Sequence, residues 1–345
     1  MHSLLKLKNH LSKYIMVYAV IAIIVGFFTG LHVNVKAHAQ LFKTLNLVVI
    51  ITMIYPMMIS LEISRLKSAS KSLKQVLIAL SMGLVIAPLL AWILILILRL
   101  FLPIPSTLAI GILLATVVPC SSMAIAYTGL SDGNIELATI VVAISFALAI
   151  VTIPLWLKLF ASSLHVSLSA WLLVKTIIIV VVIPLILGIL THHYLVHRLG
   201  TKGYLELKPL FPLVSLLGMF VIIFLIFMEK SKLVYSKLSI VGITLIPIIL
   251  YYILSLTFLT YFNKWLKIPY EDHMAIIFTS VGKNEGTAMA IALTAGMGLM
   301  AIAPAITPIV QIPFLVGYLK ISNTIKKLFS YTKSRGMIGQ GKNVA

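Results

Sequence analysis

Long apolar runs, separated by short polar or glycine- and proline-rich stretches, repeat along almost the whole chain. Most runs are close to 20 residues long, which matches a hydrocarbon core of about 30 Å at a rise of about 1.5 Å per residue. The alternation typical of strands is absent, so the runs predict membrane-spanning helices. Cutting at the polar and Gly/Pro clusters predicts ten spans, at residues 15–31, 45–61, 76–101, 108–129, 136–160, 172–190, 210–228, 239–262, 274–296 and 299–320.

The composition supports a membrane protein with many spans. Of 345 residues, 61% are hydrophobic and only 10% are charged, which is too apolar for soluble domains. The net charge of +19 comes from basic residues in short segments between apolar runs, so it indicates membrane orientation rather than a nucleic-acid partner. The basic residues 1–14 precede a run without a small-residue cleavage site, which predicts a first span and not a cleaved signal.

The distribution of Lys and Arg predicts the orientation. If both termini are cytoplasmic, the cytoplasmic segments contain more than twice as many basic residues as the external ones. This bias favours cytoplasmic termini and therefore an even number of spans. We expect a multi-pass protein of the plasma membrane, with residues 323–345 as a basic cytoplasmic tail.

The ten predicted spans divide into residues 1–162 and 163–322. Five spans in each half mean that a second copy would enter the membrane from the opposite side, as in the inverted repeats of secondary transporters. The fourth span of the first half is interrupted at Pro119-Cys120-Ser121-Ser122, and the corresponding span of the second half at Gly282-Lys283-Asn284-Glu285-Gly286. The predicted fold class is an all-α membrane protein with ten transmembrane helices in two inverted repeats, with discontinuous helices in spans four and nine.

Two charged residues lie at membrane depth. A charge at the bilayer centre costs about 2.5–3.5 kcal/mol on insertion scales, so Lys283 and Glu285 must face protein or water. A direct pair between them needs unwound backbone, which the flanking Gly282 and Gly286 permit. Freed peptide groups at such a break can hold a ligand. Alternatively, the two glycines form a packing face of one helix and the charges only neutralise each other.

The remaining candidates are small polar groups. Pro119 alone is also compatible with an ordinary kink, and Cys120 alone with a small buried hydrophobe; both gain significance from their place opposite the Lys283 segment. Gln311 in span ten is a further candidate ligand among prolines that form the wall. The single cysteine excludes an intrachain disulfide framework, and all nine histidines lie outside the span centres, so we expect no metal cofactor.

Three segments carry a resemblance to a known family. IYPMMISLEISRLK (54–67), VPCSSMAIAYTGLSDGN (118–134) and TSVGKNEGTAMAIA (279–292) resemble the bile-acid/sodium symporter and arsenite permease superfamily. The resemblance extends over about residues 12–320. It implies ten spans in two inverted repeats, with broken helices in spans four and nine that cross each other.

Within this superfamily the chain is most similar to the arsenite permeases. Their tyrosine-proline and proline-cysteine pairs match Tyr55-Pro56 and Pro119-Cys120, and the resemblance implies that Cys120 contacts arsenite. Trivalent arsenic prefers soft sulfur ligands, and one thiol gives a contact that can be released. The span-nine glutamate of those permeases lies about two residues later than Glu285.

The bile-acid branch binds sodium through residues that this chain replaces. Its serine-asparagine pair falls on Ala124 and Ile125, its span-nine glutamate on Ser280, and its methionine-glutamine pair on Lys283-Asn284. The resemblance therefore implies that the sodium ligands are missing.

These observations favour a secondary transporter that exports arsenite or a related oxyanion, driven by protons or membrane potential. A sodium/organic-anion symporter, in which Lys283 pairs with a substrate carboxylate, is the alternative. An intramembrane enzyme using Cys120 as nucleophile is disfavoured because no histidine or second acid accompanies the thiol. We expect a small-molecule or oxyanion substrate, the lipid bilayer and protons as partners.

Overall fold

The computed structural model describes residues 2–61, 73–166, 170–236, 239–295 and 299–329. In these ranges the regular elements are helices, joined at one point by an isolated β-bridge. The helices of the first part are α1 (His2–Lys13), α2 (Ile15–His32), η1 (Val35–His38), α3 (Ala39–Ile59), α4 (Leu73–Ser81), η3 (Met82–Ile86), α5 (Ala87–Leu98), α6 (Ser106–Val117), α7 (Met123–Leu130) and α8 (Ile135–Ser163). Those of the second part are α9 (Ala170–Ile177), η4 (Ile178–Val182), α10 (Ile183–Leu207), α11 (Leu210–Ser236), α12 (Ser239–Trp265), α13 (Tyr270–Val281), α14 (Glu285–Thr294) and α15 (Ile302–Lys320). A last helical segment covers 322–329.

Eight helices of the described residues are long and apolar enough to cross a membrane. They correspond to eight of the ten spans predicted from the sequence. The other two predicted spans each consist of two short helices, α6 with α7 and α13 with α14, and both interruptions fall at the predicted residues. The predicted cut at 296–298 and residues 330–345 of the predicted tail lie outside the described residues.

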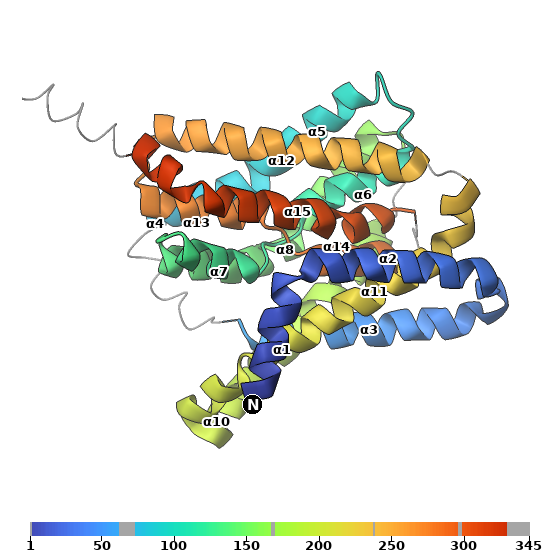
Figure 1. The fold of residues 1–345 in the computed structure, drawn as a ribbon, viewed down its shortest axis with the longest axis horizontal. Coiled ribbons are helices and arrows are strands. Elements are labelled where there is room, and N and C mark those ends of the chain that lie inside the picture. Colours follow the sequence, from blue (N-terminus) through green and yellow to red (C-terminus); the bar gives the residue numbers. More distant parts are fainter. Residues whose placement is uncertain (1, 62–72, 167–169, 237–238, 296–298, 330–345) are drawn as a thin grey trace, which may run out of the picture.

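The helices form two layers (Figure 1). We call α2, α3, α10 and α11 the four-helix layer, because α11 packs on α2 and α3, and α3 packs on α10. The core layer contains α4 with α5, α6 with α7, α8, α12, α13 with α14, and α15. Helix α14 contacts both layers through α3 and α15. The two interrupted helices therefore lie inside the core layer, with α14 at the boundary between the layers.

Small residues set the spacing within the four-helix layer. Gly26 and Gly30, one turn apart on α2, face backbone atoms of Phe224 and Met228 on α11 so closely that a Cβ would collide with their carbonyls. Such small-x-x-x-small patterns allow helix backbones to approach in a membrane, where apolar side chains gain little from leaving lipid.

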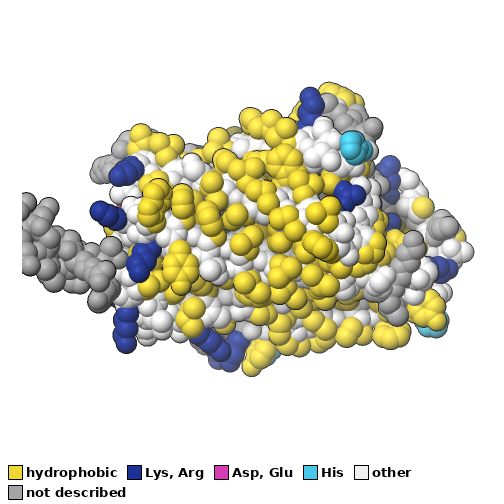
Figure 2. Space-filling view, turned by 90° about the horizontal axis from the view of Figure 1, so that it is seen from above, with side chains coloured by type: hydrophobic (Ala, Val, Ile, Leu, Met, Phe, Trp, Pro, Cys, Tyr) yellow, Lys and Arg dark blue, Asp and Glu magenta, His cyan; other side chains and the backbone are white. Residues whose placement is uncertain are grey.

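Three segments predicted to lie on the same side of the membrane meet at one end of the molecule. Asn134 N–H donates to Glu271 O at 2.8 Å, and its side-chain amide donates to Asp272 Oδ1 at 2.8 Å. Lys326 lies 3.7 Å from Asp132 Oδ2. Figure 2 shows the face over α12, where hydrophobic side chains cover the middle and Lys and Arg gather toward the ends. This surface is that of a protein surrounded by lipid.

Candidate substrate and ion site

The first interrupted helix breaks because of Pro119. Val118 has φ −59° and ψ 156°, the extended conformation that a following proline ring favours. Helix α7 starts again at Met123, after Ser122. Ser121 Oγ accepts a hydrogen bond from Met123 N–H at 3.3 Å. Cys120 is thus held in extended backbone between two short helices.

The second interrupted helix breaks at Gly282 and restarts with an asparagine cap. Gly282 has φ −78° and ψ 79°, and a Cβ there would lie 2.6 Å from Phe278 O, so only glycine fits without a shift. Asn284 Oδ1 accepts from Thr287 N–H at 3.0 Å, which satisfies one of the free donors at the start of α14. Gly282 lies beyond the end of α13 and Gly286 lies in α14, so they do not form one packing face.

The two extended segments cross and pair in antiparallel orientation. Cys120 and Lys283 form a β-bridge. Ser121 N–H donates to Gly282 O at 2.8 Å, and Asn284 N–H donates to Pro119 O at 2.9 Å. Each break therefore satisfies peptide groups of the other, as non-helical backbone at membrane depth requires. The structure brings the two predicted segments together at one crossing.

Gln311 of α15 holds the crossing from one side. Its Oε1 accepts from Lys283 N–H at 3.1 Å and from the Tyr252 hydroxyl at 2.7 Å, and its Nε2 donates to Lys283 O at 3.1 Å. The side chain is buried. In this structure Gln311 binds the backbone of the break, so its amide is already engaged.

Lys283 extends into the core layer and ends at a backbone carbonyl. The side chain is 2% exposed, and Nζ donates to Gly83 O at 2.6 Å. Gly83 lies in the π-helical turn η3, where Ala87 N–H donates to Met82 O instead of Gly83 O. The next partner in this π pattern would be Pro88, which has no N–H. The Gly83 carbonyl therefore lacks a donor within its own helix, and the lysine supplies one.

The thiol of Cys120 lies beside the same space. Its sulfur is 3.2 Å from Ser145 Oγ, whose hydroxyl donates to Val142 O at 2.8 Å. This leaves the thiol as the donor to Ser145. A small cavity at the crossing is lined by Cys120, Ser145 and Lys283. Cys120 is 2% exposed, so the thiol is closed off from solvent in this state.

Glu285 does not pair with Lys283, contrary to the pairing considered from the sequence. Its side chain is 4% exposed, yet neither carboxylate oxygen has a hydrogen-bond partner, and the Lys283 amine is bound by Gly83. The physical reason is that α14 begins at Glu285: helical geometry directs its side chain away from the extended segment that carries the lysine. Lys283 and the Tyr251 and Tyr252 phenols are close enough to interact electrostatically with Glu285, although none of them donates a hydrogen bond to it.

Methionines of α3 close the crossing toward the four-helix layer. Asn284 Nδ2 lies 2.8 Å from Met57 Sδ, and a Cβ on Gly286 would lie 3.0 Å from Met53 Sδ. Thioether chains are flexible and polarisable, and they fill irregular gaps. The boundary between the two layers is thus adaptable beside the crossing.

Sequence reasoning missed Gly83, Ser145's contact with the thiol, and Tyr252. Pro88 was an incomplete signal for the first: in an α-helix it leaves the Leu84 carbonyl free, which here accepts from Trp156 Nε1 at 2.8 Å, and Gly83 is freed only by the π-helical turn. The adjacent Tyr251-Tyr252 in the middle of a span also indicated buried polar groups. Among the described residues, no group of three or more His, Cys, Asp and Glu could hold a metal ion.

Interrupted helices that cross through paired peptide groups beside buried charges are typical of the binding sites of secondary transporters. The family model of the Sodium Bile acid symporter family matches residues 47–237, and the chain belongs to this family. It is therefore a multi-pass membrane protein of a transporter family. One curated relative, the "Arsenical-resistance protein Acr3" of Corynebacterium glutamicum, is 24% identical over 233 residues. That alignment covers 63% of this chain and 62% of the relative, less than two thirds of either.

Proposed function

We propose that the chain is an arsenite efflux permease, or exports a related oxyanion, without sodium and driven by protons or membrane potential. The observation that carries this proposal is a free thiol at the crossing of the two interrupted helices. Cys120 is the only cysteine of the chain, and it is bridged to Lys283. The similarity to an arsenical-resistance protein supports the same substrate.

The chemistry of the thiol suits a transporter. Trivalent arsenic binds soft sulfur ligands. When a thiol replaces one hydroxyl group of arsenous acid, an As–S bond forms and water leaves; the reverse reaction frees the cargo. One such bond releases its cargo more readily than the chelate that several thiolates would form. The burial of Cys120 means that binding requires a state in which the helices around the thiol have opened.

Lys283 supports the independence from sodium. Its ammonium donates to the Gly83 carbonyl inside the core layer, so a fixed positive charge already lies where a bound cation would neutralise freed carbonyl dipoles. Such a tethered charge makes a coupling cation unnecessary at this point. Two versions remain for proton coupling: the lysine exchanges the proton, or the partnerless Glu285 carboxylate does.

The packing of the half-helices supports ten spans in two inverted repeats, of residues 1–162 and 163–322. Helix α6 packs on α15, and α13 packs on α8. The first part of span four thus contacts span ten, and the first part of span nine contacts span five. These two contacts correspond to each other if the second half repeats the first. The interrupted spans four and nine, added to the eight continuous spans, give the total of ten.

In the proposed topology the protein lies in the plasma membrane with both termini in the cytoplasm. The bias of basic residues supports this orientation. Single cysteines are best placed at Leu130 and Tyr235, which are 70% and 66% exposed, because Ser131 is buried. In a Cys120→Ala background, an impermeant thiol reagent should label position 235 and not 130 in intact cells. The opposite labelling would reverse the topology.

The second candidate is a sodium/organic-anion symporter, which the family match favours. In that case Lys283 would pair with a substrate carboxylate, and transport would require sodium.

Transport by purified protein in proteoliposomes tests both candidates. Arsenite, antimonite and small carboxylates are compared under a sodium gradient, a pH gradient and a set membrane potential, with sodium then replaced by a large organic cation. We expect arsenite or antimonite flux that persists without sodium. A strict sodium requirement with carboxylate flux would replace the efflux proposal by the symporter.

A further inference from the structure

An apolar groove lies on the outer face of the core layer, away from the crossing. It runs between α12 and α15, with Ile253 and Leu256 on one wall and Phe314 and Gly317 on the other. Its volume is about 620 Å³, within the range of ligand pockets. A Cβ on Gly317 would meet nothing within 4 Å. The groove is therefore an unfilled space on a surface that faces lipid.

The helical segment 322–329 closes one end of this groove. Ile325 and Leu328 line it, whereas Lys326 and Lys327 between them are exposed. An apolar face beside adjacent lysines is the pattern of a helix that lies at the membrane surface. The groove thus ends at the level where lipid headgroups begin.

Aromatic and basic side chains mark the same level. Tyr261, on the groove, is 61% exposed, and Trp265, one turn later, is 73% exposed, as in the aromatic belts at membrane interfaces. Figure 2 shows Lys and Arg side chains gathered at an end of this face. Lys264 and Lys320 lie in the last turns of α12 and α15, Lys267 follows α12, and Lys326 and Lys327 lie in segment 322–329.

Four carboxylates of the described residues lie at this end, against five lysines: Asp132, Glu136, Glu271 and Asp272. Asp132 lies 3.7 Å from Lys326, Asp272 accepts from Asn134, and none of the four lines the groove. The two helices that form its walls end instead in Lys264 and Lys320, which gives the rim of the groove a local excess of positive charge. Anionic lipid attracts such lysines at about 1 kcal/mol each, or about fivefold in affinity.

We propose that this groove binds an anionic phospholipid, with an acyl chain between α12 and α15 and the phosphate among the lysines at the end. Other occupants fit the charge less well. A zwitterionic lipid fills the groove without using the lysines. Residues 330–345 contain Lys333, Arg335 and Lys342 and no acid, so they carry the same sign as the rim, as does a second copy of the chain.

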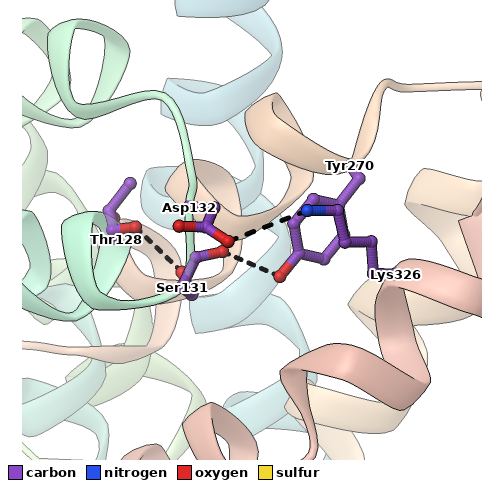
Figure 3. A network of polar contacts seen from close by, with 5 residues as sticks. All are labelled: Thr128, Ser131, Asp132, Tyr270 and Lys326. Carbon is purple, nitrogen blue, oxygen red and sulfur yellow. Dashed lines mark hydrogen bonds and ion pairs between the residues drawn. The ribbon is translucent and has the colours of Figure 1, made fainter.

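The groove is connected to both interrupted helices (Figure 3). Lys326 of segment 322–329 pairs with Asp132, which follows α7, and lies 5.4 Å from the centre of the Tyr270 ring. The Tyr270 hydroxyl, at the start of α13, donates to Ser131 O at 2.8 Å. A lipid that holds segment 322–329 in place therefore also stabilises the ends of α7 and α13.

The test uses the full chain, delipidated in detergent, and needs no transport substrate. Phosphatidylglycerol or phosphatidylcholine is added, and bound lipid is measured by native mass spectrometry and the midpoint of thermal unfolding. We expect retention and stabilisation by phosphatidylglycerol well above those by phosphatidylcholine. Gly317→Phe fills the groove and should remove this difference. Gly242→Phe is the matched control, because Gly242 of α12 also has nothing within 4 Å of its Cβ position.

A second pair of variants tests the charge. Lys264→Gln with Lys320→Gln should weaken phosphatidylglycerol binding by about fivefold for each lysine. Lys158→Gln with Lys175→Gln, on exposed lysines outside this rim, should leave it unchanged. Equal binding of the two lipids, or full binding by the Gly317→Phe protein, would overturn the proposal. So would a dimer that Gly317→Phe dissociates, since the occupant would then be a second copy.

Discussion

The two interruptions share one backbone arrangement and differ in chemistry. At the first, Cys120 is supported by the Ser145 hydroxyl of α8; at the second, Lys283 is supported by the Gln311 amide of α15. The first break is uncharged and contributes sulfur, whereas the second contributes both charges. Two hydrogen bonds join the breaks to each other. Beyond these, Gln311 adds two hydrogen bonds to the backbone of the charged break, whereas Ser145 of α8 contacts only the side chain of Cys120.

The largest effect that this comparison predicts is on stability, from Gln311→Leu. The change leaves the Lys283 N–H, the Lys283 carbonyl and the Tyr252 hydroxyl without their partner. At about 1–3 kcal/mol for each buried unsatisfied group, the loss should be about 3 kcal/mol or more. Ser145→Ala, at the neutral break, should cost below about 1 kcal/mol, because a thiol is a weak donor. Thermal unfolding in detergent measures both; equal losses would remove the asymmetry between the breaks.

The second prediction concerns transport through the sulfur. Cys120→Ser keeps size and hydrogen bonding but replaces a soft ligand by a hard one. We expect arsenite flux in proteoliposomes to fall by about 100-fold, the upper end of the effect of losing a supporting group at a metal site. Folding and expression should remain. Ser145→Ala, which keeps the thiol, serves as the control and should retain most of the flux. Full arsenite resistance of cells that depend on Cys120→Ser would exclude the sulfur mechanism.

The third prediction separates the two charges of the second break. Because Glu285 has no hydrogen-bond partner while Lys283 is bound by Gly83, we expect the carboxylate to carry the coupled proton. Glu285→Gln should abolish the response of flux to a pH gradient and slow transport by roughly tenfold, at the lower end of what a general acid or base contributes. Stability should not fall, because neither carboxyl oxygen makes a hydrogen bond that the change would remove.

Lys283→Met is the counterpart of that experiment. It removes the ammonium and leaves the Gly83 carbonyl unpaired, at a cost of about 1–3 kcal/mol. If the lysine is only a tethered cation, the remaining flux should still respond to the pH gradient. Loss of that response in Lys283→Met, with its retention in Glu285→Gln, would assign proton coupling to the lysine instead.

The smallest effects are expected at the two glycines of the second break. A Cβ on Gly282 lies 2.6 Å from a backbone carbonyl, whereas on Gly286 it lies 3.0 Å from the flexible end of Met53. Gly282→Ala should therefore destabilise the protein by roughly 1 kcal/mol, and Gly286→Ala by at most about 0.5 kcal/mol. Denaturant or thermal unfolding of the two variants measures this difference. Equal losses of stability would mean that the contact with the Phe278 carbonyl is no tighter than the contact with the Met53 side chain.

The sequence by itself determined the helices and the positions of the breaks. Apolar runs of membrane length leave the backbone one way to satisfy its hydrogen bonds, so eight spans follow from composition and periodicity. Pro119 and the Gly282 segment interrupt two further runs, because proline removes a donor and glycine permits close approach. These are local effects, and they are visible in any single stretch of the chain.

Only the tertiary structure decided which groups meet. The pairing of Pro119 with Asn284 and the contact of Lys283 with Gly83 join residues more than 160 positions apart. The expected Lys283–Glu285 pair fails because a helix begins between the two side chains, which spacing in the sequence does not reveal. Partners at membrane depth are chosen by which donors and acceptors the helix ladders leave free, and that depends on how all the helices pack.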